Sequence, residues 1–277
     1  MAIIVVSHQM GAGGPEIGMS LAQRLGYRYV NQELLLDAAR RYGLAEDKLS
    51  HLDESKPTLF ERFDTETRHH ITVLQTTCLE FAEDDNCVLM RGGGQWLLRG
   101  VPHVLRARIV APFPLRVNRL TATLSAQGKE RVTPKTVAQF VRRDDIQKSA
   151  RMRYLFDAEI KDPDLYDVLI NTAVLSRAAA VDILADAARR PELASTDAAR
   201  QLVADRVLAS QVEVALAAHA EMRRHRIDAE CDRGTITLEL PAGADPEVAR
   251  AVAREVVGVH SVKLRVTEIP VVTPFPG

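Results

Sequence analysis

The chain lacks an excess of charge of either sign, and this excludes one class of function. Its 277 residues include 36 Lys and Arg against 37 Asp and Glu, so the formal net charge is -1. Binding of nucleic acid without sequence specificity needs a strongly basic surface. We therefore expect no nucleic-acid partner, and we expect any anion-binding site to be local.

Long apolar runs and cysteine motifs are also missing. No run approaches the roughly 18 apolar residues of a membrane-spanning helix, and no basic segment with a cleavage site precedes the first expected strand. Cys78, Cys87 and Cys231 have neither CxxC spacing nor histidines at ligand spacing, which argues against a disulfide framework and a structural zinc site. We expect a cytoplasmic protein.

The N-terminus contains an apolar run followed directly by a glycine-rich segment. Residues 3–6 are all β-branched and apolar, which is typical of a strand buried on both faces. Glycines cluster over 11–14, and an amphipathic stretch over 14–25 ends at Gly26. The pattern predicts a strand, a phosphate-binding loop and a helix whose N-terminus favours an anion in the loop.

Four more apolar segments, separated by helical patterns, are expected to form strands. They cover residues 27–30, 87–90, 105–111 and 168–172, with helices expected over 32–42, 59–84 and 178–188 and a charged insertion or mobile region over 45–57. Such spacing predicts a parallel sheet, with its ligand at the carboxyl ends of the strands. Arg91 follows one of these strands, so we expect it to face the same crevice as the glycine loop.

Basic residues are concentrated between the later strands. Arg116 and Arg119 are spaced to lie on one helical face, and Arg142, Arg143, Lys148, Arg151 and Arg153 follow. The segment is either a solvated helix face, since acidic residues interleave, or a set of cations for phosphoryl transfer.

The pattern changes after residue 188. Pro191 and the Ser-Thr-Asp run over 195–197 predict a linker over 189–196 and the start of a helix. A helix over 198–224, strands over 227–231 and 235–240, a helix over 246–257 and a strand over 262–266 should follow. We predict an α/β domain over 1–188, a small α+β domain of order αββαβ over 197–268, and a flexible tail over 269–277.

Several motifs are distributed over residues 1–185. They are Ser7, Gly11, Gly13-Gly14, Ile17-Gly18, Arg91, Ala111-Pro112 with Arg116 and Arg119, Arg143-Asp144, Asp162-Pro163 and the run from Tyr166 to Thr172. Together they resemble the cytidylate kinase-like group of nucleoside-monophosphate kinases. The resemblance implies a P-loop kinase-like parallel sheet with flanking helices and transfer of the ATP γ-phosphoryl group, with Mg²⁺, to CMP, dCMP or a similar nucleotide.

The resemblance also implies roles for individual residues. Arg91 would contact the acceptor monophosphate, and Arg116, Arg119 and Arg143 would lie near or in the lid, completing the catalytic set. The cofactor-binding residues would be Gly11, Ala12, Gly13, Gly14, Glu16 and Ile17. No side chain is assigned as a metal ligand.

The loop departs from the usual pattern for phosphate binding. A Walker A loop ends in Gly-Lys-Ser/Thr, whereas Pro15 and Glu16 follow Gly14 here. Three hypotheses follow. The protein is a kinase that takes a substitute cation from His8 or a lid arginine, a pseudokinase-like nucleotide or anion sensor of weak or no activity, or a phosphate-binding enzyme with another acceptor.

The C-terminal segment has a resemblance of its own. The order of elements over 197–268, Gly234 in the expected hairpin and the run from Val256 to Val259 resemble a BON domain, although Leu240-Pro241 stand where a glycine is common. This resemblance implies contact with a phospholipid or membrane surface or, alternatively, a regulatory or dimerising role that would make the protein a homo-oligomer. In the sensor hypothesis this domain reports nucleotide occupancy to a partner.

Overall fold

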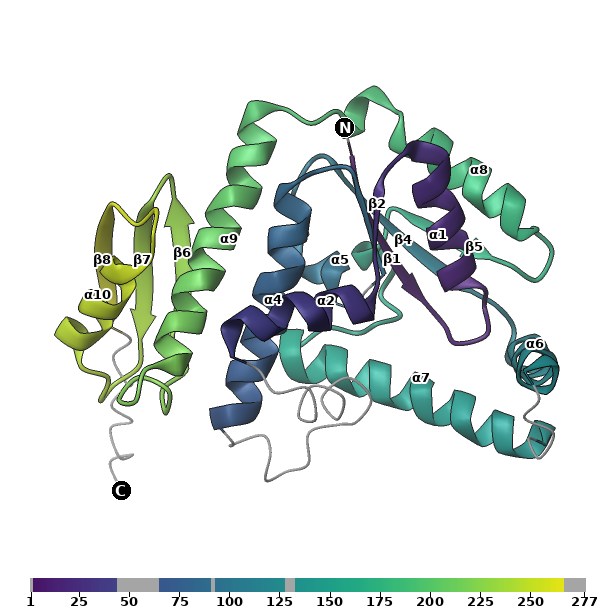
Figure 1. Ribbon diagram of the computed structural model, residues 1–277, viewed down its shortest axis with the longest axis horizontal. Coiled ribbons are helices and arrows are strands. Elements are labelled where there is room, and N and C mark those ends of the chain that lie inside the picture. The colour runs from purple at the N-terminus through teal and green to yellow at the C-terminus, as the bar shows by residue number, and fades with distance from the viewer. Residues whose placement is uncertain (1, 44–64, 91–92, 128–132, 267–277) are drawn as a thin grey trace, which may run out of the picture. The chain divides into compact units, whose positions relative to one another are not determined.

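The chain divides into two compact units. A computed structural model describes residues 2–43, 65–90, 93–127 and 133–266 (Figure 1). The first unit comprises Met1–Pro57 and Thr77–Arg200, and the second comprises Thr58–Thr76 and Gln201–Gly277. The second unit thus includes a segment that the sequence analysis assigned to the first domain, and the predicted domain boundaries remain predictions.

A five-stranded parallel sheet forms the centre of the first unit. Its strands are β1 (Ile3–His8), β2 (Arg28–Val30), β3 (Cys87–Leu89), β4 (Val104–Val110) and β5 (Val168–Asn171). They lie in the order β2-β3-β1-β4-β5, and every neighbouring pair is parallel. The central position of β1 explains why residues 3–6 are all apolar, because both of its faces are covered.

Helices cover both faces of this sheet. Among its described residues, the first unit has α1 (Gly14–Leu25), α2 (Gln32–Ala39), α5 (Gly94–Leu97), α6 (Phe113–Ala126), α7 (Pro134–Phe156) and α8 (Arg177–Ala188), with short 3-10 turns η1 (Arg40–Tyr42), η3 (Pro163–Leu165) and η4 (Pro191–Leu193). α4 (Thr65–Glu83) runs from the second unit into the first. Ile4 and Val6 pack in one core with α1 and α8, whereas Val5 lies against Gly94 of α5 on the opposite face.

The long helix α7 is fixed at both ends by its local sequence. The Thr133 hydroxyl accepts a hydrogen bond from the Thr136 N–H, and Pro134 occupies the first turn, where a missing N–H costs nothing. Asp157, in the left-handed region with φ 47°, ends the helix. Figure 1 shows α7 passing beside the carboxyl ends of the strands, and Lys148 of this helix lies 3.4 Å from the His8 carbonyl oxygen at the end of β1.

From residue 201 on, the second unit is a small α+β structure in the predicted order αββαβ. Its elements are α9 (Asp197–Ala218), β6 (Asp228–Asp232), β7 (Thr235–Leu240), α10 (Pro246–Glu255) and β8 (Ser261–Val266). The first residues of α9, up to Arg200, belong to the first unit. β6 and β7 are antiparallel, and β7 and β8 are parallel. α9 ends before the expected Arg224, because turns such as Arg223 N–H to His219 O and His225 N–H to Met222 O replace helix there. The predicted fold class is confirmed in both parts.

Two predicted segments lie outside the described residues, namely the insertion over 45–57 and the tail over 269–277. Among the residues that are described, no helix is both long and apolar enough to cross a membrane.

A buried hydroxyl pair in the second unit provides a stability test. Thr76 is fully buried, and its Oγ1 lies 2.6 Å from Ser210 Oγ. Thr76→Val keeps the shape but deprives Ser210 of this partner, so we expect a loss of about 1–3 kcal/mol in the free energy of unfolding, measured by urea denaturation. Thr123→Val is the control, because exposed Thr123 bonds only the carbonyl one turn earlier; an equal loss in the two variants would contradict this account.

Candidate functional site

The loop between β1 and α1 has a backbone that only glycine adopts readily. Gly11 and Gly13 have φ angles of 78° and 89°. A Cβ atom at Gly11 would lie 2.6 Å from the Arg116 carbonyl oxygen, so a side chain there is also excluded by space. The N–H groups of Gly13, Gly14 and Glu16 belong to the helix N-terminus, where intrahelical acceptors are lacking, and Pro15 contributes none. The loop therefore presents fewer donors than one with a residue other than proline at that position.

Arg116, predicted to be catalytic, holds three parts of the first unit together. Its side chain is 3% exposed and donates to Ala111 O, to Met10 O in the loop and to both carboxylate oxygens of Asp145 on α7, at 2.7 and 3.1 Å for the carboxylate. These bonds engage four of its five N–H groups and compensate its charge. In this arrangement Arg116 shapes the loop, and direct contact with a substrate remains a prediction.

Arg119 also acts on the loop through an intermediary. Its guanidinium donates to Thr172 Oγ1 at 2.9 Å and to Thr172 O at 2.7 Å. The Thr172 hydroxyl in turn donates to Ala12 O at 2.9 Å. Arg119 and Arg116 thus fix the loop from opposite ends, at Ala12 and at Met10.

The remaining predicted site residues are more dispersed. Ile17 lies in the apolar core, and its N–H donates to Gly13 O. Glu16 is exposed and lies 3.5 Å from Arg177 of α8. Arg143 is exposed on α7, about 200° around the helix from Asp145, and is not among the pocket residues. Arg91 lies outside the described residues, so its predicted role in acceptor binding remains a prediction.

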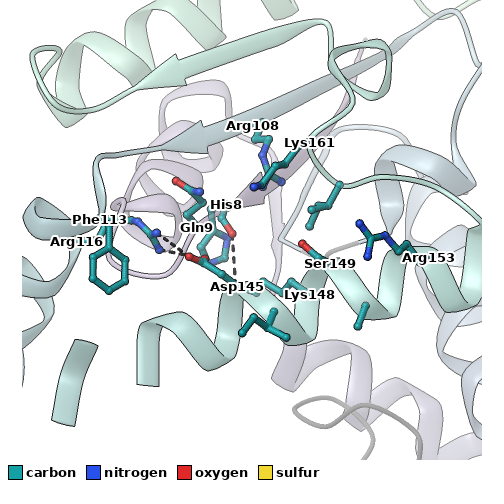
Figure 2. Close-up of a pocket in the computed structure, with 13 residues that line it drawn as sticks. His8, Gln9, Arg108, Phe113, Arg116, Asp145, Lys148, Ser149, Arg153 and Lys161 are labelled. Carbon is teal, nitrogen blue, oxygen red and sulfur yellow. Dashed lines mark hydrogen bonds and ion pairs between the residues drawn. The ribbon is translucent and has the colours of Figure 1, made fainter. Parts of the chain in front are cut away.

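A pocket of about 480 Å³ opens between the sheet and α7, next to His8 and Gln9, which lead into the loop; none of the predicted cofactor-binding residues is among those that line it (Figure 2). Its walls are His8 at the end of β1 and Gln9 after it, Arg108 of β4, Phe113 and Arg116 of α6, Asp145, Ile146, Lys148, Ser149, Ala150 and Arg153 of α7, and Ile160 and Lys161. Five of the lining residues are Lys or Arg, and one, Asp145, is acidic. The pocket is therefore cationic although the whole chain is almost neutral.

Most of these cations already have carboxylate partners. Asp145 pairs with Arg116, Lys148 lies 3.0 Å from Asp144, and Arg153 pairs with Glu159. Lys148 also reaches the end of β1, with its Nζ 3.4 Å from His8 O. Arg108 differs, because no carboxylate among the described residues lies within ion-pair distance of it.

His8, one of the two proposed substitute cations, is neutral at physiological pH. Burial, together with the positive charges of Lys148 and Arg108, lowers the pKa of its imidazole to about 3. Its ring instead fills space, since a Cβ atom at Gly14 would lie 2.4 Å from it. Of the two predicted sources, this leaves a lid arginine. Lys148, which was not predicted for this role, places its ammonium 3.4 Å from His8 O at the end of β1.

Sequence reasoning did not select Arg108 or Lys161 for the site. Arg108 stands in a strand that is otherwise largely apolar, and a buried charge in such a strand requires a compensating partner or a ligand. This signal was available from the sequence. Lys161 lies in a loop and is brought to the pocket only by the tertiary structure.

The glycine requirement at the loop can be tested against a matched position. Gly11→Ala places a Cβ atom against the Arg116 carbonyl, whereas Gly26 has a similar φ of 68° and nothing within 4 Å of its added Cβ. We expect Gly26→Ala to cost about 1–2 kcal/mol of unfolding free energy, and Gly11→Ala clearly more. Chemical denaturation measures both, and equal losses would show that crowding at Gly11 is unimportant.

The low pKa of His8 predicts a pH dependence of stability. The unfolded chain takes up this proton near pH 6.5, whereas the folded chain does so only near pH 3. The contribution of neutral His8 is thus complete above pH 6.5 and is lost as the pH falls. Between pH 8 and 5.5 the wild type should lose about 1.4 kcal/mol more than His8→Gln in urea denaturation. If the free energies of unfolding of the wild type and His8→Gln changed equally with pH, the burial of His8 would be contradicted.

Comparison with known proteins gives weak but consistent similarity to cytidylate kinases. The cytidylate kinase of Sulfolobus acidocaldarius is 24% identical over 193 residues, which cover 69% of this chain and 97% of that protein. The cytidylate kinase of Ignicoccus hospitalis is 22% identical, over 66% of this chain and 97% of that protein.

A solved structure supports the fold. An uncharacterized protein from Eubacterium ventriosum superposes with a TM-score of 0.52 at 17% identity, covering 69% of this chain and all of that one. The parallel strand order and the glycine loop after β1 are those of a P-loop kinase fold. The family described as cytidylate kinase-like matches residues 3–174, more than half of the sequence. The chain therefore belongs to the cytidylate kinase-like family.

Proposed function

We propose that this protein is a nucleoside-monophosphate kinase of the cytidylate type, which transfers the ATP γ-phosphoryl group to CMP, dCMP or a similar acceptor. The observation that carries the proposal is the cationic pocket of about 480 Å³ lined by His8 and Gln9, the two residues that lead into the glycine loop. Phosphoryl transfer spreads negative charge over oxygens that fixed donors must match, and this pocket supplies such donors. The names of the two curated relatives favour cytidylate as the acceptor.

The chain's own residues divide the work of binding and orientation. The loop glycines let phosphate oxygens approach the backbone, and the α1 N-terminus contributes its N–H groups and dipole. Arg116 and Arg119 keep the loop in shape through Met10 and Thr172. Lys148 brings a positive charge from α7 to the end of β1.

Mg²⁺ fits this site as an ion carried by the nucleotide phosphates. The described residues contain no group of three or more His, Cys, Asp or Glu side chains placed to hold a metal, and Glu16, Asp144 and Asp145 each have a basic partner. Mg²⁺ commonly binds through substrate phosphates, waters and one or two carboxylates, and it neutralises charge that develops on the transferred group.

A second candidate is a nucleotide or anion sensor with weak or no kinase activity. Pro15 stands where a basic residue usually contacts the phosphates, and Glu16 adds a negative charge to the same turn. Both features weaken stabilisation of the transition state more than they disturb the fold, since proline is tolerated in a first helical turn.

The C-terminal unit fits the sensor hypothesis as the part that reports occupancy. Its αββαβ order supports the proposed BON-like identity. On that basis we propose a regulatory or dimerising role, or contact with a phospholipid surface. Sedimentation of the full chain tests these roles: a dimer in the absence of vesicles indicates a dimerising role, and co-sedimentation with anionic vesicles indicates contact with a phospholipid surface.

Turnover decides between the two candidates. Purified protein with ATP and Mg²⁺ should convert CMP or dCMP to the diphosphate in a coupled assay, and UMP and AMP serve as competing acceptors. Binding of ATP without turnover of any acceptor would favour the sensor. Absence of both binding and turnover would exclude both candidates.

Lys148 and Lys135 provide a matched pair of variants on α7. Lys148 lines the pocket, whereas Lys135 is exposed near the start of the helix. Lys148→Met should lower kcat/KM for phosphoryl transfer at least tenfold, because one charge at the loop is lost, and Lys135→Met should change it less than twofold. Equal values for the two variants would remove Lys148 from the mechanism.

A further inference from the structure

Arg108 occupies an unusual position in the sheet. In the pairing of β1 with β4 it lies opposite Ser7, near the carboxyl end of the central strand. Its Nη1 donates to Ser7 Oγ at 2.9 Å and to the Tyr166 hydroxyl at 3.0 Å. Tyr166 is itself oriented, because its hydroxyl donates to Ile160 O at 2.9 Å. The guanidinium is therefore held from two sides by groups that carry no charge.

The rest of the guanidinium has no protein acceptor among the described residues. Nη1 uses both of its protons, which leaves the three N–H groups of Nε and Nη2. Arg108 is only 6% exposed, yet it lines the pocket, and in Figure 2 its side chain extends from β4 toward α7. These donors thus face the pocket in the forked geometry that suits two oxygens of one phosphate.

The charge balance around Arg108 is unfavourable without a ligand. Burying a charged group without an opposite charge is unfavourable, and neither His8 nor Lys148 supplies one. His8 is neutral, and Lys148 is itself a cation, paired with Asp144. Across the pocket, Asp145 is committed to Arg116 in a two-point pair.

Arg106 shows what a structural arginine looks like on the same face of this strand. It lies two residues before Arg108, and side chains two apart in a strand share a face. Its guanidinium binds both carboxylate oxygens of Asp167, at 2.6 and 3.1 Å. Arg106 is thus neutralised within the protein, whereas Arg108 is not.

We propose that Arg108 is a phosphate-binding residue of this chain, whose Nε and Nη2 groups grip a phosphoryl group of the nucleotide in the pocket. It would supply part of the positive charge that the loop lacks at Pro15. This inference deepens the proposed function: that the bound phosphate belongs to a nucleotide follows from the proposed kinase activity. The phosphate belongs either to the monophosphate acceptor or to the ATP donor, and the test has an arm for each.

The test measures anion affinity by titration calorimetry in full-length protein. Pyrophosphate is the probe for the phosphate site, CMP is the acceptor arm, and a non-hydrolysable ATP analogue is the donor arm. Arg108→Gln should weaken pyrophosphate binding at least tenfold and should weaken the arm whose phosphate Arg108 contacts. Arg106→Gln, which removes a guanidinium from the same strand face, should change pyrophosphate affinity less than twofold.

Two results would overturn the proposal. One is a folded Arg108→Gln variant that binds pyrophosphate as the wild type does, with only its melting temperature lowered, because Arg108 would then be structural. The other is a wild type that binds no pyrophosphate at millimolar concentration. If Arg108→Gln does not fold, Arg108→Lys decides, since it keeps the charge but loses the fork: binding at least threefold weaker supports the proposal, and unchanged binding contradicts it.

The same experiments separate this proposal from the proposed function. Arg108-dependent pyrophosphate binding in a protein that phosphorylates no monophosphate would support the phosphate site and refute the kinase. Conversely, CMP turnover with the same kcat/KM in wild type and Arg108→Gln would support the kinase and refute the role of Arg108.

Discussion

The pairing of β1 with β4 is the constraint on which the candidate site depends. It places Ser7 opposite Arg108 and His8 opposite Ile109, and the bond from Gln9 N–H to Ile109 O carries the pairing into the loop. A slip of one residue would turn Arg108 toward the apolar face that packs on α1 and α8. The apolar burial of two strands therefore fixes both the glycine loop and the guanidinium beside it.

The pairing of each basic side chain with a carboxylate then distinguishes cations that serve the fold from cations that can bind an anion. Arg106, Arg116, Lys148 and Arg153 each have a carboxylate partner, so an incoming anion must compete with that partner. At Arg108 there is no such competition among the described residues. An uncompensated guanidinium is electrostatically unfavourable, so an anion that binds beside Arg108 stabilises the folded chain by mass action.

Local patterns in the sequence predicted the strands, the glycine loop, α1 and the order of the second unit, because each depends on neighbouring residues. The partners of the arginines could not be predicted in this way. Arg116 meets Asp145, 29 positions later, and Arg119 meets Thr172, 53 positions later. Their spacing predicted that the two arginines share one helical face. Only the folded chain shows that Arg116 bonds the loop directly and that Arg119 does so through Thr172.

The ion pair between Arg116 and Asp145 also attaches the middle of α7 to α6. Asp145 lies near the middle of this helix, with Phe140 and Arg143 on the arm before it and Lys148 and Arg153 on the arm after it. Val137 and Val141 on the first arm pack in an apolar cluster with Val117 of α6, and Met152 on the second arm packs with Ile160 and Leu165. Because apolar contacts hold α7 on both sides of Asp145, the Arg116–Asp145 pair couples the geometry of the glycine loop to the packing of this helix.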